Sequence, residues 1–164
     1  MVQEIISGGQ TGVDQAALDV AIEFNIPYSG YCPKGRLDET GHIPERFKCL
    51  KEITGEFKNE QENYNARTKM NIEDSDATLI IVPEIPLPEK IKDGTLLTIS
   101  HAEKTGKPYL IVSLKDELDS ASKKITTWLN ALKICRINIA GPRESSCPGI
   151  NEASIQFLRA VIYS

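Results

Sequence analysis

A glycine-rich segment between a strand pattern and a helix pattern is the feature that most constrains this sequence. Residues 7–14 read Ser-Gly-Gly-Gln-Thr-Gly-Val-Asp. An apolar stretch from Val2 to Ile6 precedes them, and apolar residues recur at near-helical spacing after them, from Ala16 to Phe24. The pattern predicts a strand, a tight turn and a helix in succession.

A turn of this kind is typical of anion sites, because its N–H groups and the helix dipole attract negative charge. The spacing fits neither the dinucleotide-binding nor the P-loop motif. A purely structural role is the alternative, with Thr11 and Asp14 as a capping box. A carboxylate would repel phosphate, so we expect Asp14 to cap, to hold a hydroxyl or to pair with an arginine. The predicted phosphate contacts here are Gly8, Gly9, Gln10, Thr11 and Gly12.

Length and charge limit the possible classes of protein. The chain has 164 residues and a net charge of −4, which predicts a single domain spanning 1–164 and argues against nucleic-acid binding through a basic face. Its four cysteines have no metal-finger spacing, and His42 has no ligand-type neighbours, so we expect no metal site. We find no signal peptide or membrane-spanning pattern, and we expect reduced thiols and a cytoplasmic location.

The rest of the chain alternates between strand and helix patterns. We predict strands at 28–31, 77–82, 109–113 and 136–140, helices at 63–72, 96–106, 120–132 and 150–163, and an irregular, proline-rich segment at 83–92. This alternation predicts an α/β fold: a Rossmann-like three-layer sandwich with a mainly parallel sheet of about five strands and helices on both faces.

Ligands of such folds bind beyond the carboxyl ends of the strands. Glycine-bearing turns follow the first, third and last strands, so we expect these turns to meet at one edge. The second turn contains Gly94 and Thr95, although Thr95 also suits a helix N-cap. The third turn adds Gly141, Pro142, Arg143, Glu144 and Ser145. The Arg143 guanidinium can fork onto two phosphate oxygens; an ion pair with Asp14 or Glu144 is the alternative.

Two further groups are candidate ligand contacts. Lys34, Gly35 and Arg36 follow a predicted strand and could hold a phosphate, or could be solvated charges on a turn. Arg67 and Asn71 lie four residues apart on a predicted helix, where they could face a ligand or form a surface pair.

These blocks together resemble the family called putative molybdenum carriers, a branch of the Rossmann-like group that includes the LOG-type and lysine-decarboxylase-like nucleotide-binding proteins. The similarity covers nearly the whole chain. The matching blocks are 8–14 with 16–19, 32–36, Arg67-Thr68 with Asn71, 74–76 through Leu79-Ile80, Gly94-Thr95, 138–145 and 148–150.

The resemblance implies a carrier that binds molybdenum cofactor, a phosphate-bearing pterin (molybdopterin), or a nucleotide, and delivers it unchanged. Molybdoenzymes would be the recipients, and we expect a homo-oligomer that pairs through helices. Gln15 and Asp93 depart from the arginine and glycine that we expect in relatives, which favours a nucleotide or nucleoside derivative. The alternative function is a LOG-like phosphoribohydrolase that releases the base from a nucleoside monophosphate. Thr98 stands where the catalytic glutamate of that group would be, so we favour binding over catalysis.

Overall fold

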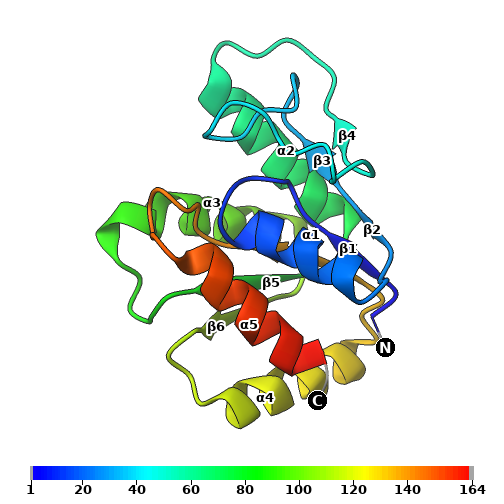
Figure 1. Ribbon diagram of the computed structural model, residues 1–164, viewed down its shortest axis with the longest axis vertical. Helices are drawn as coiled ribbons and strands as arrows, with labels where there is room; N and C mark the ends of the chain where they lie inside the picture. The colour runs from blue at the N-terminus through cyan, green and yellow to red at the C-terminus, as the bar shows by residue number, and fades with distance from the viewer. Residues whose placement is uncertain (1, 163–164) are drawn as a thin grey trace.

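The computed structural model describes residues 2–162, except for the side chains of residues 92, 93 and 162 (Figure 1). Strands and helices alternate along most of the chain, as the sequence predicts. In chain order the elements are β1 (Glu4–Ile6), α1 (Val13–Glu23), β2 (Tyr28–Ser29), β3 (Tyr31–Cys32), β4 (Lys51–Glu52), α2 (Glu60–Asp74), β5 (Ala77–Val82), α3 (Glu89–Thr105), β6 (Tyr109–Ser113), α4 (Leu118–Leu132), β7 (Arg136–Ala140) and α5 (Ile150–Ile162).

The main sheet has five strands in the order β2-β1-β7-β5-β6, and every neighbouring pair is parallel. The predicted α/β fold with a parallel sheet is therefore confirmed. Because β7 pairs with both β1 and β5, the carboxyl ends of these three strands lie side by side at one edge of the sheet. The loops that follow β1 and β7 begin at this edge.

One face of the sheet carries the main apolar core. Ile5, Leu79 and Ile137 pack there against helices α1, α4 and α5. Strand side chains alternate between the two faces, so Ile80 points the other way, toward α2 and α3. Those two helices pack against each other, and the candidate site lies on their side of the sheet.

The predicted strand 28–31 is broken at Gly30. This residue has φ of +140°, and a Cβ added to it would lie 2.1 Å from the Ser7 carbonyl oxygen. The chain therefore turns out of the main sheet after β2. β3 pairs instead with β4 in a separate two-stranded sheet, and Cys32 of β3 belongs to a small apolar cluster that includes Phe47 and Leu50.

The prediction that residues 83–92 lack regular structure is wrong at its end, because α3 begins at Glu89. Pro88 is the residue before the helix and has φ of −59°, a value that suits a helix start. Gly94 and Thr95 consequently lie inside α3, and neither forms the predicted turn or N-cap. The glycine-bearing turn expected after the third strand does not exist.

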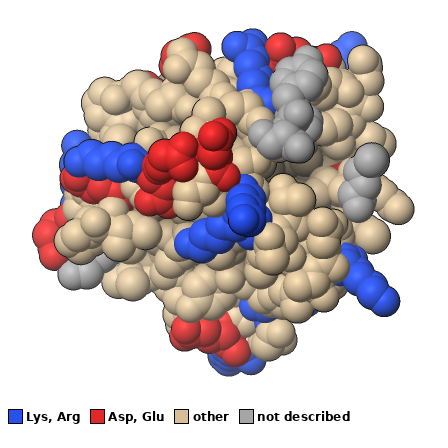
Figure 2. All heavy atoms as spheres, turned by 90° about the horizontal axis from the view of Figure 1, so that it is seen from below, with Lys and Arg blue, Asp and Glu red and all other residues tan. Residues whose placement is uncertain are grey.

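Charged side chains of both signs are mixed over the face of the molecule shown in Figure 2, with no broad basic patch. None of the helices in residues 2–162 combines the length and apolar character that crossing a membrane requires.

Candidate functional site

The loops after β1 and β7 meet, as predicted, and are tied together by hydrogen bonds. The Val13 N–H donates to the Pro142 carbonyl at 3.2 Å, and the Glu144 N–H donates to Thr11 Oγ1 at 3.2 Å. The Asn151 side chain donates to the Gly12 carbonyl at 3.0 Å. Two of the three predicted turns thus form one rim.

Close backbone approach explains the glycine at position 12. Gly12 has φ of +81°, and a Cβ there would lie 2.2 Å from the Pro142 carbonyl oxygen. No larger side chain fits without moving one of the two loops. Gly8 has a similar constraint, since a Cβ on it would lie 1.9 Å from the Arg67 guanidinium.

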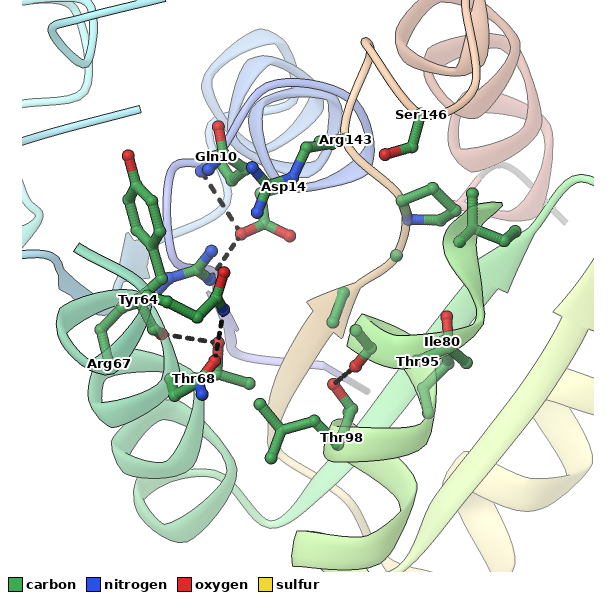
Figure 3. A pocket seen from close by; sticks show the side chains of 18 of the residues that line it. Gln10, Asp14, Tyr64, Arg67, Thr68, Ile80, Thr95, Thr98, Arg143 and Ser146 are labelled. Carbon is green, nitrogen blue, oxygen red and sulfur yellow. Dashed lines mark hydrogen bonds and ion pairs between the residues drawn. The ribbon is translucent and has the colours of Figure 1, made fainter. Parts of the chain in front are cut away.

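A cavity of about 570 Å³ opens between this rim and helices α2 and α3 (Figure 3). The rim contributes Gln10, Asp14, Arg143 and Ser146, and the sheet contributes Ile80 and Ala140. The remaining lining residues are Gln61, Tyr64, Asn65, Arg67 and Thr68 of α2, Lys90, Ile91, Gly94, Thr95, Leu97 and Thr98 of α3, and Gly141 and Pro142 of the rim. Its size is in the usual range for small-molecule sites.

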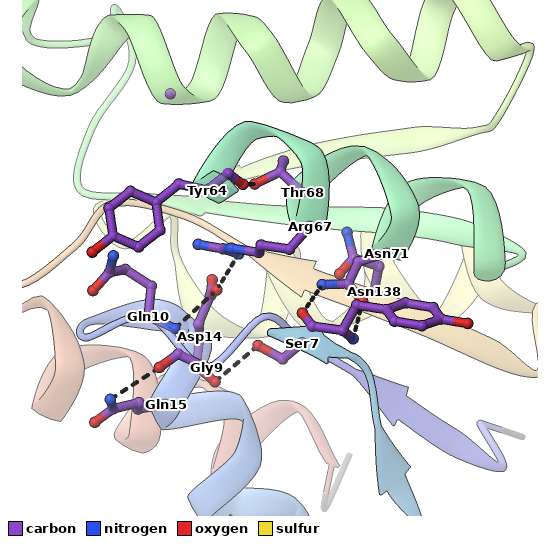
Figure 4. A network of polar contacts seen from close by, with 12 residues as sticks. Ser7, Gly9, Gln10, Asp14, Gln15, Tyr64, Arg67, Thr68, Asn71 and Asn138 are labelled. Carbon is purple, nitrogen blue, oxygen red and sulfur yellow. Dashed lines mark hydrogen bonds and ion pairs between the residues drawn. The ribbon is translucent and has the colours of Figure 1, made fainter. Parts of the chain in front are cut away.

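Asp14 forms a buried ion pair with Arg67, with Oδ2 and Nη1 2.9 Å apart (Figure 4). Of the roles predicted for Asp14, the structure shows the pairing with an arginine. The capping box is wrong: Gly12 is the N-cap, no side chain caps α1, and Thr11 Oγ1 donates to Glu39. Burial raises the pKa of Asp14 above its ordinary value, although Arg67 opposes part of this rise.

The main-chain donors of the glycine-rich loop are mostly used by the protein itself. The Thr11 N–H donates to Gln10 Oε1 at 3.0 Å, and the Gln10 N–H reaches Asp14 Oδ2 at 3.4 Å. Hydrogen bonds from the backbone of Gln10 and Gly8 also oppose the rise of the Asp14 pKa that burial causes. The Asp14 carboxylate therefore occupies the position over these N–H groups that we expected a phosphate to take.

Two side-chain donors in the cavity wall remain without a partner. Gln10 Oε1 accepts hydrogen bonds from the N–H groups of Thr11 and Glu39, which fixes the amide and leaves Nε2 buried with no acceptor in residues 2–162. Arg67 Nε is likewise buried and has no partner among these residues. Buried donors are nearly always satisfied, so this pair points to a missing acceptor.

Arg143 lines the same cavity. Its guanidinium lies 5.7 Å from the centre of the Tyr64 ring, and its Nη1 atom lies 4.0 Å from Glu39 Oε2. Neither Asp14 nor Glu144 pairs with it in the described chain. Glu144 instead accepts hydrogen bonds from the Gly149 and Asn151 N–H groups at the start of α5.

Ser145 donates through both its N–H and its hydroxyl to Glu39. Glu39 also accepts from Thr11 Oγ1, and so joins the loop after β3 to both parts of the rim. Burial alone would raise the pKa of Glu39, but the hydrogen bonds from Ser145 and Thr11 and the attraction of the nearby Arg143 charge outweigh it and lower the pKa. The sequence contains no local signal for Glu39, because its partners are far away in the chain.

Ten predicted contacts lie outside the cavity lining. Six of them belong to the two loops after β1 and β7: Gly8, Gly9, Thr11, Gly12, Glu144 and Ser145. The other four have partners elsewhere in the protein. Lys34 contacts the Gly55 carbonyl and Glu56, and Arg36 donates to the carbonyls of Leu50 and Phe47. The Gly35 N–H donates to Glu52. The Asn71 amide makes two hydrogen bonds to the Tyr31 backbone, at 2.7 and 2.9 Å, which join α2 to β3.

Several lining residues could have been found from helical spacing. Gln61, Tyr64, Asn65 and Thr68 recur every three or four residues around Arg67, so one face of α2 turns toward the cavity. Lys90 and Ile91 could not be found, because the start of α3 was placed too late. Residues 2–162 contain no cluster of three or more His, Cys, Asp or Glu side chains arranged for a metal ion.

Comparisons with known proteins agree with this fold. Residues 5–162 match the family described as circularly permutated YpsA SLOG. The crystal structure of a putative molybdenum carrier protein from Syntrophus aciditrophicus SB is 41% identical, with a TM-score of 0.87 over 98% of this chain and 95% of that one. The comparison of this chain with curated proteins found no match. The predicted family is thus confirmed, and the chain belongs to the circularly permutated YpsA SLOG family as a molybdenum carrier-like member.

Proposed function

We propose that this protein binds a phosphate-bearing pterin or nucleotide-like ligand in the cavity and carries it without chemical turnover. The observation that carries the proposal is the pair of buried donors, Gln10 Nε2 and Arg67 Nε, which have no acceptor in residues 2–162. Buried N–H groups without acceptors are costly, and an oxyanion would satisfy both.

The geometry of Arg67 suits a phosphate. Its Nη1 atom is held by Asp14, so the opposite edge, formed by Nε and Nη2, is the one left for a ligand. That edge carries two parallel N–H donors, the arrangement that binds two oxygens of one phosphate. Because Asp14 neutralises one cation and fills the space over the loop, the phosphate would bind beside Arg67 rather than on the main-chain N–H groups.

The charge of the lining also favours an anion. Three cationic residues, Arg67, Lys90 and Arg143, line the cavity, against Asp14 as the one carboxylate in the described lining. No cysteine or histidine is among these lining residues. The protein would therefore hold a molybdenum-bearing cofactor by its pterin and phosphate, and not by a bond from these side chains to the metal. The name of the similar structure makes molybdenum cofactor the first candidate cargo. Molybdoenzymes in the cytoplasm would then be the recipients. That the protein forms a homo-oligomer by pairing of helices stays a prediction.

Replacing Arg143 with alanine is expected to weaken binding of guanosine 5′-monophosphate by about tenfold, since one charge-assisted hydrogen bond is lost. The melting temperature should barely change, because Arg143 is partly exposed and its closest ion-pair contact is 4.0 Å long. Titration calorimetry on both proteins measures the effect. Lys34→Ala is the matched control: it removes a cation outside the cavity lining and should bind like the natural protein. If Arg143→Ala and the natural protein bound guanosine 5′-monophosphate with equal affinity, Arg143 would not be a ligand contact.

The enzyme alternative has two residual candidates for acid or base work, Asp14 and Glu144. Glu144 lies outside the cavity lining and accepts hydrogen bonds from the Gly149 and Asn151 N–H groups, so Asp14 is the carboxyl on which the alternative depends. The ion pair with Arg67 makes Asp14 a poor general acid or base. The position of the catalytic glutamate in the LOG-type group is taken by Thr98, which cannot replace it. Incubation with adenosine monophosphate is therefore expected to release no adenine above a heat-inactivated sample, measured by chromatography. Adenine release that disappears in Asp14→Asn would overturn carriage and establish the phosphoribohydrolase.

A further inference from the structure

The polar groups of the cavity are not evenly distributed. In the view of Figure 3, Gln10, Asp14 and Arg143 lie at one end, and Thr68 of α2 and Thr98 of α3 lie at the other. Gln10 Nε2, a buried donor without a partner in residues 2–162, belongs to the first end, and Asp14 holds the Arg67 guanidinium toward it. The second end has the opposite hydrogen-bonding character.

The two threonine hydroxyls have already used their protons. Thr68 Oγ1 donates to the Tyr64 carbonyl at 3.0 Å, and Thr98 Oγ1 donates to the Gly94 carbonyl at 3.1 Å. A hydroxyl has one proton and two lone pairs, so each oxygen can only accept a further hydrogen bond. Such bonds to the helix backbone are common for threonine. What matters here is that both residues line the cavity and that Thr98 is buried.

Apolar side chains line much of the rest of the cavity. Ile80, Ile91 and Leu97 contribute to the wall, with the Tyr64 ring on the side of α2. A flat heterocycle suits a lining of this kind, with its ring faces on apolar groups and its edge on a few polar atoms. A bare oxyanion would fill little of a cavity of about 570 Å³.

We infer that the ligand is a phosphate monoester whose far end is a heterocycle with N–H donors, bound by Thr98 Oγ1 and Thr68 Oγ1. This inference rests on the proposed function, because it takes the phosphate to bind at Gln10 and Arg67. A 2-amino-4-oxopyrimidine ring meets the requirement, since its ring N–H and its amino group both donate. Pterins and guanine share this edge. Free phosphate or molybdate lacks such an edge and would satisfy only one end of the cavity.

The test compares three ligands by titration calorimetry: guanosine 5′-monophosphate, purine riboside 5′-monophosphate and inorganic phosphate. The first two share their ribose and phosphate, but purine riboside has no N–H group on its base. The natural protein should bind the guanosine ligand at least about tenfold tighter than the purine riboside ligand, as two hydrogen bonds would give. Thr98→Val should weaken binding of guanosine 5′-monophosphate by about fivefold. The affinities for purine riboside 5′-monophosphate and inorganic phosphate should not change. Thr98→Ser, which keeps the hydroxyl, should bind guanosine 5′-monophosphate as tightly as the natural protein does.

Each other outcome is decisive. Equal binding of the two nucleotides, with phosphate also bound, would overturn the donor requirement and leave the proposed anion site intact. Equal weakening of all three ligands in Thr98→Val would show that Thr98 only supports the structure, and would also overturn the inference. If none of the three ligands bound the natural protein, the proposed function itself would fall.

Discussion

Replacing Arg67 with methionine is expected to lower the free energy of unfolding by about 3 to 5 kcal/mol at pH 7, because it leaves the buried Asp14 carboxylate without its counter-ion. Denaturant titration measures this loss. Arg159→Met is the matched control: it breaks an ion pair with Glu23 whose two side chains are about half exposed, and should cost less than about 1 kcal/mol.

The loss in Arg67→Met should depend on pH in a defined direction. Burial already raises the Asp14 pKa in the folded state, and without the guanidinium it would rise further. An acid whose pKa is higher in the folded state makes the protein less stable as pH rises from the unfolded pKa through the folded one. The deficit should therefore be small near pH 4, around the ordinary pKa of an aspartate, and full at neutral pH.

The double variant Asp14→Asn with Arg67→Met should recover most of the stability, because no charge is then buried. Ligand binding should stay lost in it, since the free edge of Arg67 is absent. A loss in Arg67→Met that was the same at pH 4.5 and pH 7, or that the second substitution did not relieve, would contradict the role given to this ion pair.

Gly12→Ala is expected to lower the free energy of unfolding by about 2 to 4 kcal/mol, from the strained positive φ and the contact with the Pro142 carbonyl. The β1 and β7 loops would have to separate, so the rim of the cavity would also change. Thermal or denaturant unfolding measures the stability, and binding of guanosine 5′-monophosphate measures the rim.

Gly94→Ala is the matched control. Gly94 lies inside α3, and a Cβ added to it would have no heavy atom within 4 Å. Alanine should therefore stabilise the helix by about 0.5 to 1 kcal/mol. If both glycine variants were equally destabilised, the close approach of the two loops would not be the cause. If Gly94→Ala were the worse of the two, Gly94 would belong to a turn after all.

The strands of the main sheet were predictable where the sequence alone determines burial. The continuous apolar run at β5 is limited by Asp76 and Pro83, and its observed bounds match the predicted ones. The observed bounds of β6 and β7 match the predicted ones as well. The start of α3 was missed because three prolines between 83 and 88 suggest an irregular chain, although the last of them is compatible with a following helix.

The site was predictable to the extent that it depends on strand ends. Gln10, Asp14 and Arg143 were candidates because they follow predicted strands, and all three line the cavity. Arg67 was a candidate from helix spacing, and Gly94 and Thr95 line the cavity from inside α3 and not from the predicted turn. The sequence could not show that Asp14 would fill the anion position of its own loop, since this depends on Arg67, 53 residues away. It also could not show Glu39, whose hydrogen bonds to Ser145 span 106 residues.

The most direct test of the central claim is mass spectrometry, with phosphorus and metal analysis, of the small molecule released when the purified protein is denatured. We expect a phosphate monoester of a pterin or purine, close to one per chain, and we expect it to be absent from protein that carries Arg67→Met and Asp14→Asn together. A released molecule without phosphate, or equal release from both proteins, would contradict binding through Gln10 and Arg67.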